Sequence, residues 1–294
     1  MSLAARRAEA LGAHLPPLLV AAERVASTVA QGVHGRRRVG QGDSFWQFRP
    51  FLQGDTISRI DWRVSARSDR TYVRETEWEA AQTVCLWRDG GASMRWRSRG
   101  QPVEKADRAG LLMLALAALL LRGGERVRLI APGSRPLHGR AGLERLADAM
   151  ERAPEQPGGE DAGLPPEVKL PPHARAVLIG DLLAPLDRWQ AAIARLAAVP
   201  LTGVLLQVLD PAEVTLPYEG RVRFQGITGA QSTLIPRVEG VREQYAQRLA
   251  AQQRGLAAIC AAAGWSFAVH RTDHPPEAAL LALYTALAPT ARRR

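Results

Sequence analysis

The sequence contains only two cysteines, Cys85 and Cys260, and each lies inside an apolar segment. A disulfide framework is therefore not expected, since a free thiol in such a segment behaves as a small hydrophobe. Long apolar runs are missing as well. The longest, from Leu111 to Leu121, is about half of what a bilayer span needs, so we interpret it as a buried helix. These two absences predict a cytoplasmic protein without a membrane span.

The motifs of several enzyme classes are also absent. No Gly-x-x-x-x-Gly-Lys-Ser/Thr stretch occurs, so the chain has no nucleotide-binding P-loop of its own. The six histidines lack the i, i+4 spacing of a helical zinc site, and none lies in a Gly-x-Ser-x-Gly or comparable nucleophile motif. We therefore expect that the protein is not an enzyme.

Lysine is nearly absent, because only Lys105 and Lys169 are lysines among 39 basic residues. The resulting arginine bias, together with many alanines and glycines, is typical of a high-GC coding sequence. A formal net charge of +10 suits nucleic acid, since clustered cations neutralise phosphates. The basic residues are nevertheless spread along the chain, with local runs only at 36–38 and 292–294. A nucleic-acid-binding module that uses these runs is therefore an alternative function, and nucleic acid is not the favoured partner.

What the sequence does contain is a regular alternation of elements from Thr83 onward, within a chain of 294 residues and 46% hydrophobic content. Short apolar, strand-like runs alternate with stretches of helical periodicity. Strands are expected at 83–88, 126–131, 174–179, 202–209 and 265–269, and helices at 104–121, 142–152, 189–198, 238–263 and 276–287. A β-excursion is expected at 218–234. This order predicts an α/β fold with a doubly wound, mostly parallel sheet.

Three aspartates, Asp89, Asp181 and Asp210, each stand at the end of a predicted strand. In open parallel sheets ligands bind beyond the carboxyl ends of the strands. The three side chains can therefore converge on one edge of the sheet, which makes that edge the first place to look for a site.

The first 80 residues have a different character. Residues 4–33 indicate a helical arm interrupted at Pro16-Pro17, and a dense polar and aromatic block follows at 43–79, with its best strand candidate at 71–78. We therefore divide the chain into residues 1–80, a helical arm with a small β-rich segment, and residues 81–294, the α/β domain.

The most distinctive motif lies at residues 48–67, which we call the signature block. Its ordered positions are Arg49, Gly54-Asp55, Arg59, Ile60-Asp61-Trp62 and Ser65-Ala66-Arg67, followed by Tyr72-Val73-Arg74-Glu75 and Glu77. This pattern closely resembles the signature of the bacterial "domain of unknown function 58" family, in which it precedes a von Willebrand factor A-like domain. The resemblance implies that fold for residues 81–294. It also implies a partner, a MoxR-type AAA+ ATPase that assembles or activates other proteins.

The signature block also has a physical interpretation of its own. Arginine forks pair bidentately with carboxylates, and such networks fix one packing geometry when they are partly buried. We favour an internal ion-pair network of Asp55, Arg59, Asp61 and Arg67 that docks the block on the domain. The alternative is a partner-binding surface, which would include Arg49 and Trp62.

The resemblance further implies a metal-ion-dependent adhesion site, because von Willebrand A domains bind a divalent cation through an Asp-x-Ser-x-Ser loop. Asp89 and Ser93 match the first and last positions, while Gly91 replaces the middle serine, and Asp181 could stand for a later aspartate. Hard cations need several oxygen ligands, so we expect an incomplete site with weak affinity for Mg²⁺ or Mn²⁺. Alternatively, Asp89 caps a turn by accepting amide hydrogens around Gly90-Gly91.

The resemblance, together with the missing enzyme motifs, implies a non-catalytic adaptor or scaffold that presents an unknown client protein to a MoxR-type ATPase. Its functional surface would be the loop edge around Asp89, Ser93 and Asp181, with the signature block beside it. A metal-dependent hydrolase that requires Asp89 and Asp181 is a weaker alternative, which no nucleophile motif supports.

Overall fold

The computed structural model describes residues 17–32, 44–52, 60–68, 70–77, 82–152, 163–226 and 232–287. The chain divides into two compact units. One contains residues 82–294 together with the N-terminal helix, and the other contains residues 32–81.

The N-terminal helix α2 (Pro17–Gly32) belongs to the α/β unit, which differs from the predicted grouping of the arm with the signature block. Its apolar side chains recur at helical spacing and are at most 7% exposed: Ala22, Val25, Ala26 and Val29. They form one core cluster with the side chains of α4 (Lys105–Arg122). The burial of this apolar stripe explains why the helix joins that unit.

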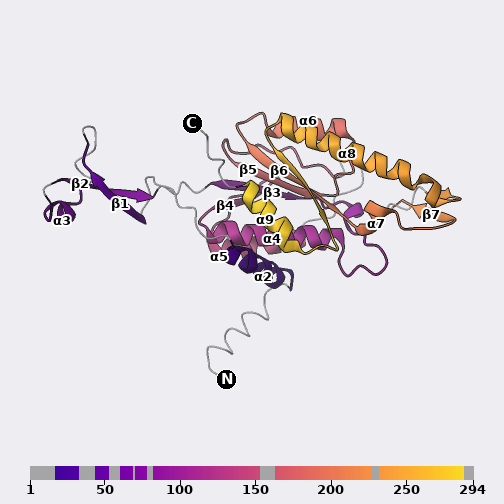
Figure 1. The fold of residues 1–294 in the computed structure, drawn as a ribbon, viewed down its shortest axis with the longest axis horizontal. Helices are drawn as coiled ribbons and strands as arrows, with labels where there is room; N and C mark the ends of the chain where they lie inside the picture. The colour runs from indigo at the N-terminus through magenta and orange to yellow at the C-terminus, as the bar shows by residue number, and fades with distance from the viewer. Residues whose placement is uncertain are drawn as a thin grey trace, which may run out of the picture. The chain divides into compact units, whose positions relative to one another are not determined.

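The α/β unit is built on a five-stranded parallel sheet (Figure 1). Its strands are β3 (Thr83–Arg88), β4 (Arg126–Leu129), β5 (Arg175–Gly180), β6 (Thr202–Leu209) and β9 (Ser266–Arg271), in the order β4-β3-β5-β6-β9. All four neighbouring pairs are parallel, and Val127 and Leu137 add an antiparallel bridge beside β4. The predicted doubly wound, mostly parallel sheet of von Willebrand factor A-like type is therefore confirmed. The strand order reverses between β3 and β5, which makes this the topological switch point of the sheet.

Helices cover both faces of the sheet, as Figure 1 shows. On one face, α2, α4, α5 (Gly139–Arg152) and α9 (Pro276–Ala286) share a core cluster with the sheet. On the other face, α6 (Leu186–Leu196) and α8 (Arg242–Ala262) form the second cluster. The apolar run from Leu111 to Leu121 lies within α4 between the sheet and the outer helices, so its interpretation as a buried helix is confirmed. No helix in the described part of the chain has the length and apolar character to cross a membrane.

Shorter elements connect the sheet to these helices. They are the 3-10 turns η2 (Ala92–Met94) and η3 (Val238–Val241), and helix α7 (Pro211–Thr215). The β-excursion predicted at 218–234 corresponds to an antiparallel hairpin of β7 (Val222–Gln225) and β8 (Ser232–Ile235), which ends one residue later.

The second unit contains an antiparallel pair, β1 (Ser44–Pro50) and β2 (Tyr72–Glu77), and the single-turn helix α3 (Trp62–Ser65). The strand expected at 71–78 corresponds to β2. Neither β1 nor α3 was expected, because β1 mixes polar and aromatic residues without a clear apolar period and α3 is a single turn. The amide of Asp61 donates to the carbonyl of Tyr72 at 3.0 Å, which joins the start of α3 to the start of β2.

Candidate functional site

Asp89, Asp181 and Asp210 directly follow β3, β5 and β6, and all three residues are at most 2% exposed. We call the place where these strands end the carboxyl edge. The first two residues stand on either side of the switch point, where doubly wound folds place their ligands. The structure brings the edge together around Lys105, the first residue of α4.

Lys105 is the central charge of this edge. Its Nζ atom donates to Asp181 Oδ2 at 3.1 Å and to Glu213 Oε1 at 2.5 Å, and the residue is only 1% exposed. Burial alone would lower the pKa of the ammonium group, but the carboxylates of Asp181 and Glu213 together raise that pKa above its ordinary value. Lys105 is therefore a permanent cation at neutral pH, held by carboxylates that follow two different strands.

Asp210 and Glu213 form a capping box at the start of α7. The two carboxylate oxygens of Asp210 accept the amide hydrogens of Ala212 at 2.8 Å and Ser98 at 2.9 Å. Glu213 Oε2 accepts the amide hydrogen of Asp210 at 2.8 Å. Both acids thus hold backbone in place, and through Ser98 they tie the loop that precedes α4 to the end of β6.

Asp89 makes the contact that the turn-capping interpretation predicts, because its Oδ1 atom accepts the amide hydrogen of Gly91 at 2.7 Å. Its other oxygen, Oδ2, is buried and has no hydrogen-bond partner among the described residues. Burial, followed by the neighbouring charge of Asp181, raises the pKa of Asp89 to about 6. Among the acids of the edge, Asp89 is therefore the one whose negative charge is least stabilised by hydrogen bonds.

The donors at this edge do not suit a divalent cation. A Cβ atom on Gly91 would lie 3.0 Å from Asp89 Oδ1 and 3.7 Å from Ser93 Oγ, so the loop has the shape of the motif but lacks its middle oxygen. Asp181 Oδ2 already accepts a hydrogen bond from the Lys105 ammonium. Among the described residues, no group of three or more His, Cys, Asp or Glu side chains could hold a metal ion. A cation at Asp89, Ser93 and Asp181 stays a prediction that this geometry does not favour.

Glutamine side chains fix the loop that follows β5. Gln207 donates to the carbonyl of Asp181 at 2.9 Å and accepts from Gln253 of α8 at 3.0 Å. Gln252 donates to the carbonyls of Leu182 and Ala184 at 3.2 Å and 2.9 Å. The acidic loop is therefore held from the sheet and from α8, which leaves its carboxylate little freedom to move.

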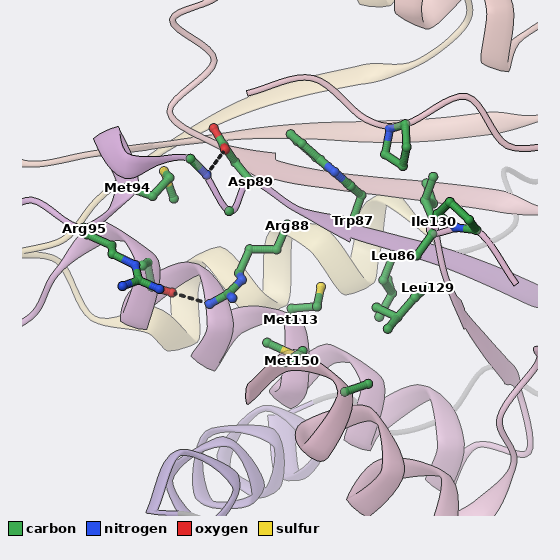
Figure 2. A pocket seen from close by; sticks show the side chains of 17 residues that line it. Leu86, Trp87, Arg88, Asp89, Met94, Arg95, Met113, Leu129, Ile130 and Met150 are labelled. Atoms are coloured by element: carbon green, nitrogen blue, oxygen red, sulfur yellow. Dashed lines mark hydrogen bonds between the residues drawn. The ribbon is translucent and has the colours of Figure 1, made fainter. Parts of the chain in front are cut away.

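An apolar cavity of about 320 Å³ opens beside Asp89. Figure 2 shows its wall, to which β3, β4, α4 and α5 contribute Leu86, Leu129, Met113 and Met150 respectively. Arg88 also lines the cavity, and its guanidinium donates to the carbonyl of Ala106 at 3.3 Å. This volume is enough for a small apolar group, and methionine walls adapt readily to shape.

In the signature block, the structure gives Asp61 a local role. Its Oδ1 atom accepts the amide hydrogens of Arg63 and Val64, both at 3.1 Å, and so caps α3. Trp62 is 65% exposed and Arg67 is also exposed. Asp55, Arg59 and the side chain of Arg49 lie outside the described residues, so the ion-pair network stays a prediction. The arginine runs at 36–38 and 292–294 lie outside them too.

Sequence reasoning missed Lys105 and Glu213 as members of the edge. The sequence carried no specific signal for Lys105, because the only other lysine, Lys169, is exposed. The signal for Glu213 was its spacing from Asp210, which is that of a capping box.

Comparisons with known proteins agree with the resemblance seen in the sequence. The model of a family described as "Protein of unknown function DUF58" matches residues 47–255. The uncharacterized proteins Rv1480 of Mycobacterium tuberculosis and Mb1516 of Mycobacterium bovis are each 27% identical over 274 residues, which cover 90% of this chain and 85% of each relative.

Two solved structures from Bacteroides are also similar. An aerotolerance-related membrane protein from Bacteroides fragilis has a TM-score of 0.42 at 14% identity, and the match covers 70% of this chain and 98% of that one. The conserved hypothetical protein BatB from Bacteroides thetaiotaomicron has a TM-score of 0.38 at 14% identity, with 70% and 97% covered.

Proposed function

The chain belongs to the DUF58 family, and on that premise we propose that it is a non-catalytic adaptor that presents a client protein to a MoxR-type AAA+ ATPase. The signature block would contact one of the two proteins. The sequence resemblance supplies the class of the ATPase, and the structure supplies the surface that we assign to the contact.

The observation that supports this proposal most is the exposed surface around α3. Trp62 is 65% exposed, and Arg63 and Arg67 beside it are exposed as well. Tryptophan and arginine are enriched among the few residues that carry most of the binding energy of protein interfaces.

This surface is also held in a fixed shape before any partner arrives. The Asp61 carboxylate caps α3, and Ser65 Oγ accepts the amide hydrogen of Tyr72 at 2.8 Å. A preorganised surface binds with a smaller loss of conformational entropy than a flexible one. The geometry therefore suits recognition.

The carboxyl edge supports the non-catalytic part of the proposal. Asp210 and Glu213 bind backbone amides, and Asp181 is bonded to Lys105. Acids that hold structure in this way are poorly available for proton transfer or metal binding. The proposal also includes a cytoplasmic setting, which the buried free thiols of Cys85 and Cys260 support.

The test is capture of the full chain by a purified MoxR-type ATPase from the same organism. Because hot-spot residues contribute at least about 2 kcal/mol, we expect Trp62→Ala to weaken binding about 30-fold or more. Leu281→Ala is the matched control, since Leu281 on α9 is an exposed apolar side chain (43%) outside the signature block. Its affinity should equal that of the unmodified chain.

Three outcomes would contradict the proposal. The first is equal capture of the Trp62→Ala variant and the unmodified chain, and the second is the same loss in the Leu281→Ala control. The third is absence of capture combined with DNA binding that falls steeply with salt, which would favour the nucleic-acid alternative.

A further inference from the structure

Lys105 occupies a position that is unfavourable for a lysine on two grounds. It is the first residue of α4, where the helix dipole favours negative rather than positive charge. It is also 1% exposed, although lysine is almost never fully buried unless it is paired. A residue that is costly in both respects requires a compensating role at this place.

The compensation comes from carboxylates that belong to separate strands. Asp181 follows β5, Glu213 follows β6 on α7, and both accept hydrogen bonds from the Lys105 ammonium. Asp89, which follows β3, is close enough for the ammonium to lower its pKa. The ammonium thus hydrogen-bonds acids that follow two strands, and its charge acts on a third acid, Asp89, without a direct bond. A bound divalent cation likewise gathers acidic side chains from separate strand ends.

The ammonium and a divalent cation exclude each other here. A metal ion coordinated by these acids would lie about 2.0–2.6 Å from their oxygens. The Lys105 Nζ atom already lies 3.1 Å from Asp181 Oδ2 and 2.5 Å from Glu213 Oε1. Two cations cannot share this small, buried space, because repulsion between them is poorly screened away from water.

We propose that Lys105 is a tethered cation that takes the place of a divalent ion at the carboxyl edge. The Lys105 side chain extends from α4 and places its ammonium between the acids. A domain with a complete Asp-x-Ser-x-Ser loop would instead bind a divalent cation from solution. The edge is then assembled by folding alone. Its structure and its interactions become independent of metal concentration and insensitive to chelators.

The experiment compares thermal unfolding of the full chain in EDTA and in millimolar Mn²⁺. The unmodified chain should have the same Tm in both solutions. In EDTA, Lys105→Ala should lower Tm by about 10 °C, because it leaves the buried carboxylates of Asp181 and Glu213 without a cation. Mn²⁺ should then recover at least half of that loss in this variant, since the vacated space lies among acids. Lys169→Ala is the matched control, because Lys169 is the other lysine and is exposed.

Two results would overturn the proposal. One is a Mn²⁺-dependent rise in Tm of the unmodified chain that Asp181→Asn abolishes, since it would show a functional metal site. The other is a Tm of Lys105→Ala that is unchanged in EDTA, or that is lowered in EDTA but not raised by Mn²⁺.

If Lys105→Ala does not fold, a variant in which Lys105, Asp181 and Glu213 are all uncharged tests whether Lys105 acts through its charge. The variant Lys105→Met/Asp181→Asn/Glu213→Gln has similar side-chain volumes and no charge to compensate, so it should fold without added metal. Failure of this variant to fold would show that Lys105 does not act through its charge. None of these outcomes depends on whether the chain is an adaptor.

Discussion

His270 of β9 is the titratable group whose ionisation the fold opposes most clearly, and its replacement by glutamine is our most quantitative prediction. The residue is 5% exposed, and its Nε2 atom lies 3.3 Å from a nitrogen of the Arg108 guanidinium. Arg108 also donates to the carbonyls of Thr272 and His274, at 2.8 Å and 2.6 Å, so it is fixed in place. The imidazole must therefore accept at Nε2 and remain neutral.

The electrostatic consequence has a definite sign. Burial, followed by the charges of Arg108 and His274, lowers the pKa of His270 from 6.5 to about 4, although Asp273 partly opposes this effect. Between these two values the unfolded chain binds more protons than the folded one, so stability falls as the pH falls. At about 1.4 kcal/mol per pH unit, the free energy of unfolding should decrease by about 2 kcal/mol between pH 7.5 and pH 5 on account of this residue alone.

Urea denaturation at pH 7.5 and pH 5 measures this difference. The loss between the two pH values should be about 2 kcal/mol larger in the unmodified chain than in His270→Gln, whose amide oxygen still accepts from Arg108. All other titrating groups are common to both proteins, so their contributions cancel. His138→Gln, at an exposed position, should leave the pH dependence unchanged. Equal losses in the unmodified chain and in His270→Gln would refute the reasoning.

Two further predictions concern the carboxyl edge and the core. Asp89 has its pKa raised to about 6, so it binds a proton more readily when folded, and its ionisation costs stability as the pH rises from about 4 to 6. Asp89→Asn should therefore raise the free energy of unfolding at pH 8 by up to about 3 kcal/mol, and lower stability of the variant in urea would contradict this. Gly203→Ala should lower stability by about 1–3 kcal/mol in thermal unfolding, because the new Cβ would lie 2.5 Å from the Trp265 ring. Gly240→Ala, with nothing within 4 Å, is its control, and equal effects would argue against a clash.

The architecture of the α/β unit could be predicted from the sequence because its signals are strong and local. The strand at 83–88 and the helix at 104–121 correspond to β3 (Thr83–Arg88) and α4 (Lys105–Arg122). A parallel sheet that helices cover on both faces buries its strands on both sides, and the apolar residues of these two segments follow that pattern. Helix α3 was missed because its four residues are too few to show a period, and β1 was missed because its seven residues mix polar and aromatic side chains without a regular apolar alternation.

The candidate site was only partly predictable. The position of Asp89, Asp181 and Asp210 at strand ends follows from the order of strands and helices. The pairing of Lys105 with Glu213 does not, because the two residues are 108 positions apart and meet only when α4 and α7 reach the same edge. Pairs so far apart in the sequence depend on how α4 and α7 pack in three dimensions. The order of strands and helices along the chain does not specify that packing.

The packing of α2 against α4 changes how the signature block should be viewed. Residues on both sides of the block belong to the α/β unit, so the block is an insertion in one folded body rather than a domain that precedes it. A protein bound to the insertion would stay linked to that body after a single proteolytic cut in either connection. Residues 17–31 of α2 are part of the folded α/β unit, and their removal would have a structural cost. This removal would expose the apolar side of α4 that Ala22, Val25 and Ala26 help to cover, and such a shortened chain should be prone to aggregation.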